Sequence, residues 1–276
     1  YKFEEAEQQY EKFSAFVGAD KGWKKDIEYY KRQAAFAKTV VATPINVQIS
    51  NLGDSINSEY PDFSPVLSAD ERTLIYTTRR PSSTGGEKTG DGQFYEDIVV
   101  SYKDDKGTWT KPQPLSTFVN TNGHEASVNL SPDGQTLIVY KSDGGGDIFY
   151  STWDGKQWTS LQQFGSDLNT PKSWESHACL TNDGNTIYFV SDRPGGFGGR
   201  DIYRCVKLPN GMWSKALNVG PVINTEYDED GGFMHPDGKT FFFASKGHKT
   251  MGGFDIMFSI LDEDNKFTEP FNLWHP

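Results

Sequence analysis

The hydrophobic pattern at the start of the chain is helical. Apolar residues recur at helical spacing from Phe3 to Val17, and a second series runs from Ile27 to Val41. Pro44 ends the second series, because the residue before a proline disfavours the helical conformation. Residues 1–44 are therefore predicted to form a helical lead-in, a short α-helical hairpin of two antiparallel helices.

After Pro44 the pattern changes and repeats. Each repeat opens with an apolar residue, an Asn and a hydroxyl residue, as in 223–225, and continues with a tight turn such as Asp237-Gly238. A strongly apolar run follows, then an Asp-Ile-aromatic step or a variant of it, and finally an aromatic residue before a hydroxyl. The Asp of the Asp-Ile step lies at Asp97, Asp147, Asp201 and Asp255, with spacings of 50, 54 and 54 residues.

A period of this length with four strand-like runs per unit is typical of propeller blades. Glycine in the tight turn supplies the positive φ that a hairpin needs. The apolar run fits a second strand covered on both faces by neighbouring blades. Residues 45–276 are therefore predicted to be all-β, a β-propeller with four complete blades of four antiparallel strands. The aromatic residue before the hydroxyl is expected on each outer strand.

Closure of the propeller needs further strands. Residues 45–53 resemble the end of a repeat, 216–220, and so are expected to be the outer strand of another blade. The fourth repeat carries its own outer strand in 266–273. The sequence therefore predicts a propeller truncated at the C-terminus, with partner strands after Pro276 and five or six blades in the full-length protein.

Charge is concentrated in the repeats. The net charge is −11, and residues 1–44 hold 8 basic and 7 acidic residues, which leaves 19 basic and 31 acidic residues for 45–276. A field of that sign repels phosphate backbones, so nucleic acid is not expected as a partner. No apolar run approaches the roughly 20 residues that span a bilayer, so no transmembrane segment is expected.

Reactive side chains show no catalytic pattern. Cys179 and Cys205 are expected on the first and third strands of one blade, roughly 10 Å apart from the usual strand spacing, and hence free and buried. The histidines are scattered and have no zinc-ligand spacing (His124, His177, His235, His248, His275). No nucleophile elbow occurs, and the glycine run 195–199 enters a strand instead of a helix, so a hairpin loop is preferred to a phosphate loop.

One acidic constellation recurs. A carboxylate lies eight residues before each turn Asp, and further acidic residues lie near it (Asp62, Glu125, Glu175, Glu229; Glu59, Asp228, Asp230). These positions enter the inner strands and are expected at one mouth of the central channel. Two interpretations stay open: a cation or partner site, with calcium as the cation, or acceptors of backbone N–H bonds that hold blades in register. Trp174, beside Glu175, suggests that the ligand at this mouth is a glycan.

Several motifs resemble a known group. The Asn-Leu-Gly step at 51–53, Ser-Pro-Asp-Gly at 131–134 and the segments 191–203 and 247–256 resemble the TolB-like propeller of Bacteroidetes cell-envelope proteins. In that group tetratricopeptide helices precede the propeller and an OmpA-like peptidoglycan-binding domain usually follows. The likeness implies a periplasmic, outer-membrane-associated scaffold, with members in type IX secretion. Peptidoglycan binding would belong to the OmpA-like domain, which these residues do not include.

We therefore expect a non-catalytic protein–protein interaction module that binds other cell-envelope proteins and needs no cofactor. The alternative is a propeller module that binds a glycan or a peptide at the channel mouth. A hydrolase with dispersed active-site residues is a third class.

Overall fold

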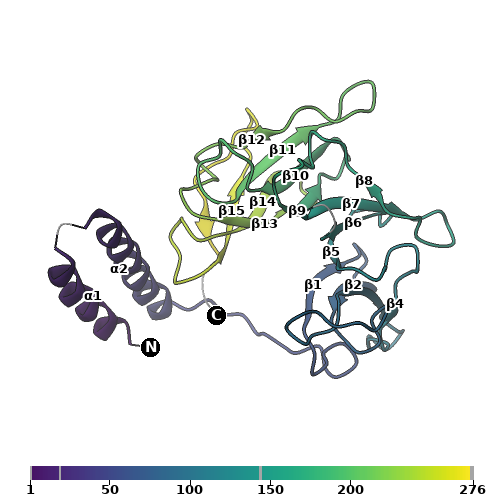
Figure 1. Cartoon of the computed structure of the whole chain (residues 1–276), viewed down its shortest axis with the longest axis horizontal. Helices are drawn as coiled ribbons and strands as arrows, with labels where there is room; N and C mark the ends of the chain where they lie inside the picture. Colours follow the sequence, from purple (N-terminus) through teal and green to yellow (C-terminus); the bar gives the residue numbers. More distant parts are fainter. Residues whose placement is uncertain (1, 19, 143–144, 274–276) are drawn as a thin grey trace.

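The computed structural model describes residues 2–18, 20–142 and 145–273. Two helices, α1 (Phe3–Val17) and α2 (Lys21–Ala42), precede four four-stranded sheets arranged as propeller blades (Figure 1). The first two blades are β1 (Asp62–Leu67), β2 (Thr73–Thr78), β3 (Asp97–Tyr102), β4 (Gln113–Pro114) and β5 (Glu125–Leu130), β6 (Thr136–Lys141), β7 (Asp147–Thr152), β8 (Gln162–Gln163). The last two are β9 (Glu175–Leu180), β10 (Thr186–Ser191), β11 (Asp201–Val206), β12 (Leu217–Asn218) and β13 (Glu229–Met234), β14 (Thr240–Ser245), β15 (Asp255–Ile260), β16 (Phe271–Asn272). The predicted blades and their number in this chain are confirmed.

Every blade is a simple antiparallel meander whose strand order follows the sequence. The tight turns join the first and second strands as predicted: Gly134, Gly184 and Gly238 have φ of 70°, 65° and 68°. Glu71 occupies the same position in the first blade with φ of 57°. That left-handed conformation costs a residue with a Cβ free energy that glycine does not lose.

The aromatic residue that closes each repeat was expected on the outer strand, and this placement is wrong. Trp109, Trp158, Trp213 and Phe267 lie in the hairpin before that strand, each in a β-bridge with the residue that follows the third strand. The hydroxyl side chain of the residue after each aromatic stabilises this β-bridge. In the first blade, for example, Thr110 Oγ1 accepts a hydrogen bond of 3.0 Å from Tyr102 N–H at the end of β3.

The hydrophobic core lies between neighbouring blades. One cluster joins the first and second blades, a second joins the second and third, and a third joins the third and fourth. The second strand β10, between two blades, is consequently buried on both faces. In β14, at the end of the series, burial alternates, because only one of its faces meets another blade among the described residues. At the other end, β2 is buried on both faces, because Leu74 and Tyr76 pack against Ile56 of its own repeat.

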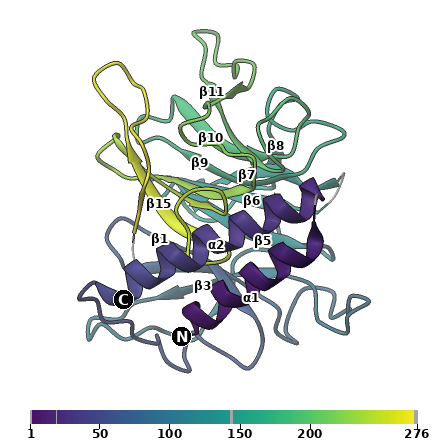
Figure 2. The same ribbon diagram turned by 90° about the vertical axis from the view of Figure 1, so that its left-hand side faces the viewer.

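The helical lead-in is an antiparallel hairpin beside the fourth blade (Figure 2). Tyr10 of α1 stacks on Tyr30 of α2 at 5.8 Å between ring centroids, and Phe13 meets Trp23 edge-on at 5.5 Å. The buried residues of α2 include Ile27, Ala34 and Ala37, as the periodicity predicts. Neither helix, in the part of the chain that the structure describes, combines the length and apolarity needed to cross a membrane.

Candidate functional site

The recurring carboxylates lie at the start of each inner strand, as the sequence predicts. Their side chains are buried in the protein. Glu125, Glu175 and Glu229 have no exposed surface, and the side chain of Asp62 is only 7% exposed. The face of the propeller on which the inner strands begin, together with the loops between second and third strands, is called the mouth face below.

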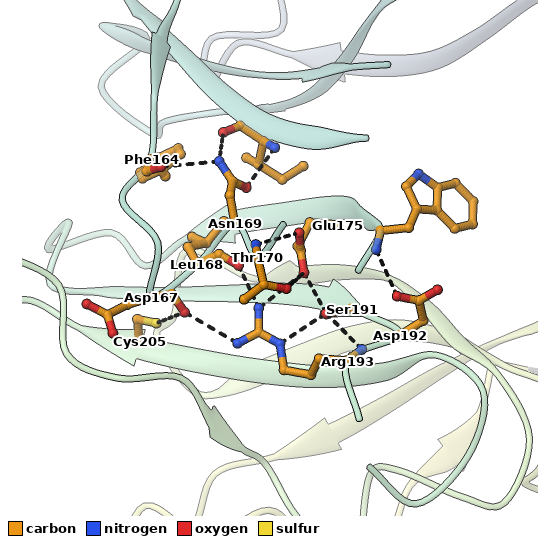
Figure 3. A network of polar contacts seen from close by, with 12 residues as sticks. Phe164, Asp167, Leu168, Asn169, Thr170, Glu175, Ser191, Asp192, Arg193 and Cys205 are labelled. Carbon is orange, nitrogen blue, oxygen red and sulfur yellow. Dashed lines mark hydrogen bonds and ion pairs between the residues drawn. The ribbon is translucent and has the colours of Figure 1, made fainter. Parts of the chain in front are cut away.

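Glu175 shows what these carboxylates do (Figure 3). It accepts hydrogen bonds from Thr170 N–H and Thr170 Oγ1, both 3.2 Å, and from Ser191 Oγ at 2.7 Å. Arg193 adds an ion pair of 3.2 Å and donates 2.6 Å to Leu168 O. The carboxylate thus ties the loop before its own strand to the end of the second strand.

Equivalent bonds form in the other three blades. Thr225 N–H lies 2.8 Å from Glu229, Thr121 N–H 2.9 Å from Glu125, and Ser58 N–H 2.7 Å from Asp62. These distances favour the interpretation in which the four carboxylates hold loops and blades in register.

Burial sets the protonation of two of these groups. It raises the pKa of Glu229 to about 7 and raises the pKa of Glu125, and the hydrogen bonds from Thr225 and Thr121 offset only part of that effect. Asp62 is buried too, but its hydrogen bonds from Thr78, Ser58 and Arg80 prevail and lower its pKa. Glu229 therefore takes up its proton close to neutral pH.

The remaining predicted residues gather where the third and fourth blades meet, except Glu59, which is exposed near the first blade. Arg200 Nη1 lies 2.6 Å from Asp230 Oδ2, and Arg200 Nη2 lies 3.6 Å from Asp228 Oδ2. The same guanidinium lies over the rings of Trp174 and Phe254, at 5.2 and 5.4 Å. These five residues are called the aromatic–ion cluster.

The charged groups of this cluster are largely engaged in ion pairs, whereas its aromatic rings are partly exposed. Lys246 Nζ adds a 2.8 Å ion pair to Asp228 and lies 4.6 Å from the Phe254 ring centroid. Trp174 is 37% and Phe254 40% exposed, against 17% for the Arg200 side chain. The surface therefore presents aromatic rings held by a partly exposed, paired ion network, and aromatic residues and arginine are enriched at protein interfaces.

The glycine run 195–199 positions Arg200. A Cβ on Gly198 would lie 2.1 Å from Tyr227 O, and one on Gly199 would lie 2.4 Å from Asp228 Oδ1. Only glycine lets this loop pack on the neighbouring blade, where Arg200 N–H donates 3.2 Å to Asp228. The predicted hairpin-loop role of the run agrees with this packing.

Sequence reasoning missed the contact between α2 and the mouth face. Tyr29 stacks on Tyr227 at 4.4 Å and donates a 2.9 Å hydrogen bond to Lys246 O. Lys25 pairs with Glu226 at 2.6 Å, and Gln33, buried, donates to Thr250 Oγ1 at 3.1 Å. The helical hairpin is thus fixed next to the aromatic–ion cluster. Lys25, Tyr29 and Gln33 at spacing four on one helical face were the available signal.

The two thiols lie on strands separated by a third strand. Cys179 on β9 and Cys205 on β11 are free and buried, with β10 between them, as predicted. Burial raises their pKa to about 12 and about 11, so neither is a thiolate at neutral pH. Residues 2–18, 20–142 and 145–273 contain no group of three His, Cys, Asp or Glu side chains able to hold a metal ion. His275 lies outside the described residues.

Known structures support the fold. The chain is similar to TolB from Acinetobacter baumannii, with 20% identity over 80% of this chain and 45% of that one, at a TM-score of 0.51. Further similarities are to a putative TolB from Agrobacterium tumefaciens (18% identity, 79% and 83% covered, TM-score 0.45) and to the periplasmic gluconolactonase of Pseudomonas aeruginosa (14%, 75% and 71%, 0.41). No protein family and no curated protein matches the sequence. The chain has a TolB-like β-propeller fold and spans less than half of the Acinetobacter chain.

Proposed function

We propose that this chain is a non-catalytic protein–protein interaction module whose binding surface is the aromatic–ion cluster on the mouth face. The observation that carries the proposal is the arrangement of Trp174 and Phe254 around Arg200. Tryptophan and arginine are enriched among the residues that dominate binding energy, and they do so when a desolvated, well-packed surface holds them. Asp228 and Asp230 supply that support from the next blade.

The rigidity of the surface favours a scaffold. The cluster rests on two blades joined by a continuous core, and α2 is fixed beside it. A surface that is already ordered loses little side-chain entropy on binding, so this aromatic patch can bind another protein without rearrangement. The half-exposed rings are what a partner covers, while the ion network stays beneath them.

The sequence resemblance gives the proposal its setting. We place the module in the periplasm, associated with the outer membrane, as a scaffold for other cell-envelope proteins like those of the tetratricopeptide–propeller–OmpA-like architecture. A PorE-like component of type IX secretion is the specific case that the motifs favour. Peptidoglycan would be reached only through a separate OmpA-like domain.

A second candidate is a glycan- or peptide-binding module. Trp174 favours it, because a half-exposed indole beside carboxylates suits a sugar ring. The hydrogen-bonding groups around it are engaged, however: Trp174 Nε1 donates 3.0 Å to Tyr140 Oη, and Arg200 is paired twice. Sugars need free donors and acceptors, so the protein partner is preferred.

The test is a crosslinking capture from the native cell envelope with three forms of the chain. The first is unchanged, the second carries Trp174→Ala and Phe254→Ala, and the third carries Trp153→Ala. Trp153 is a matched control, because it is 38% exposed and lies in a hairpin between third and fourth strands, away from the mouth face. An envelope protein held by the first and third forms and lost by the second supports the proposal. Capture that Trp153→Ala abolishes equally, or glycan binding without protein capture, contradicts it.

A further inference from the structure

Arg204 stands at a position that is apolar or aromatic in the other three blades. By the register of each third strand with its second strand, the corresponding residues are Val100, Tyr150 and Phe258. The partner of Arg204 on β10 is Tyr188, which belongs to the core between the third and fourth blades. Arg204 therefore brings a positive charge to the junction of these two blades.

The guanidinium of Arg204 has no carboxylate partner among the described residues, although the residue is partly buried. The other two arginines of the third blade each lie in an ion pair, of 3.2 Å for Arg193 and 2.6 Å for Arg200. Burial raises the pKa of Tyr188, and the charge of Arg204 offsets only part of that rise. A guanidinium presents planar pairs of N–H donors that match the two oxygens of a carboxylate, so Arg204 is available to such a group.

Arg204 lines two cavities between the third and fourth blades, of about 450 and 650 Å³. The smaller one, called the basic groove below, contains a second basic residue, Lys266, and no acidic residue of the described chain lines it. Lys266 Nζ lies 3.3 Å from Asp264, but these side chains are 74% and 75% exposed, so solvent screens the pair. The rest of the lining is an apolar wall with two amides beside it (Leu217, Val219, Val222, Phe267; Asn218, Asn265).

The larger cavity carries negative charge instead. Asp183 and Asp237 line it. Both carboxylates accept hydrogen bonds within their own turns, of 3.0 Å from Asn185 N–H and 2.8 Å from Thr240 N–H. An anion is therefore repelled from that side of Arg204 and attracted to the side of Lys266. Residues 45–276 hold 31 acidic and 19 basic residues, so a polyanion is disfavoured and a single negative charge fits best.

We propose that the basic groove binds the C-terminal carboxylate of a peptide that ends in an apolar residue. Arg204 would donate two parallel hydrogen bonds to the carboxylate, and Lys266 would add a second positive charge. The last side chain of the peptide would cover the apolar wall, and the exposed amide of Asn265 would bond the preceding peptide group. The volume of about 450 Å³ lies within the roughly 300–1,000 Å³ typical of ligand sites. The groove lies at the outer strand β12, separate from the aromatic–ion cluster and independent of it.

The cavity between the first and second blades is a natural control. It has a volume of about 380 Å³ and is lined by Val100, which occupies the position of Arg204, and by Leu130 and Trp158. No basic residue of the described chain lines this cavity. A ligand that needs only an apolar wall would bind both cavities, whereas the carboxylate would bind the basic groove alone.

The probe is acetyl-Ala-Ala-Leu with a free C-terminal carboxylate, titrated into the intact chain while backbone amide shifts are followed by nuclear magnetic resonance. Saturable shifts are expected at Arg204, Leu217 and Lys266, and none at Val100. The same peptide with a C-terminal amide should bind at least about tenfold more weakly, because it loses a charge-assisted hydrogen bond. Arg204→Gln should weaken binding of the free acid by a similar factor and leave the amidated peptide unchanged. Arg72→Gln, at an exposed arginine of the first blade, should change neither.

Equal affinity for the two peptides overturns the proposal, and this comparison does not depend on the folding of any variant. Unchanged binding to Arg204→Gln, or shifts of equal size at Val100, would also overturn it. Octanoate has the carboxylate without peptide groups, so equally tight binding of octanoate would contradict a peptide ligand. Displacement of the peptide by an equal concentration of inorganic phosphate would contradict a carboxylate site.

Discussion

Asn224 allows a matched prediction, because Asn57, at the corresponding position before the first blade, bonds no strand of the described residues. Asn224→Ala removes both bonds to Ile202. Ile202 O keeps its 3.2 Å bond from Val219 N–H, but Ile202 N–H, in a residue with no exposed surface, loses its partner.

The magnitude follows from these two losses. A buried N–H left unpaired costs about 1–3 kcal/mol, and the second bond contributes about 1 kcal/mol, so Asn224→Ala is expected to lower the free energy of unfolding by about 2–4 kcal/mol. Asn57→Ala removes no bond to a strand, and an exposed substitution of this kind changes stability by about 0.5 kcal/mol or less.

The assay is urea unfolding of both variants followed by tryptophan fluorescence, with the slope of the transition checked for constancy. The reasoning is refuted if Asn57→Ala is as costly as Asn224→Ala. It is also refuted if Asn224→Ala lies within about 0.5 kcal/mol of the unchanged chain, which is the range of neutral surface substitutions.

Three further predictions concern the turn, the buried acid and the glycine loop. Glu71→Gly, at φ of 57°, is expected to raise the free energy of unfolding by about 1 kcal/mol in the same assay, and a loss of stability would contradict the turn geometry. Because the pKa of Glu229 is raised to about 7 from 4.5, the folded chain binds the proton more tightly, so stability should fall as pH rises from 4.5 to 7. Glu229→Gln should flatten that dependence, and an unchanged slope would argue against it. Gly198→Ala should displace Arg200 and weaken partner binding while far-UV circular dichroism stays unchanged, because the Cβ meets Tyr227 O.

The blades were predictable because their markers repeat. The turn glycines, the Asp-Ile steps and the apolar second strands recur at a nearly constant period, and each has one local conformational role. The acidic positions were predicted as well, but two roles were left open for their carboxylates: binding a cation or partner, or accepting hydrogen bonds within the propeller. The hydroxyl that follows each motif asparagine, such as Thr225 four residues before Glu229, was the sign that these carboxylates are internal acceptors.

The aromatic–ion cluster was only half predictable. Trp174, Asp228 and Asp230 attracted notice beside the repeating carboxylates, whereas Arg200 and Phe254 stand at positions that vary between repeats. The docking of Tyr29 and Gln33 joins residues more than two hundred positions apart in the sequence. Periodicity carries no information about such single long-range contacts, so they emerge only from the packed structure.

The most direct test of the central claim is the affinity of the captured envelope partner for the intact chain, Trp174→Ala and Trp153→Ala, measured by isothermal titration calorimetry. The account predicts that Trp174→Ala weakens binding by about 2 kcal/mol or more, the range of an interface hot spot, while Trp153→Ala leaves it unchanged. Equal affinity of Trp174→Ala and the intact chain would contradict the claim that the aromatic–ion cluster is the binding surface.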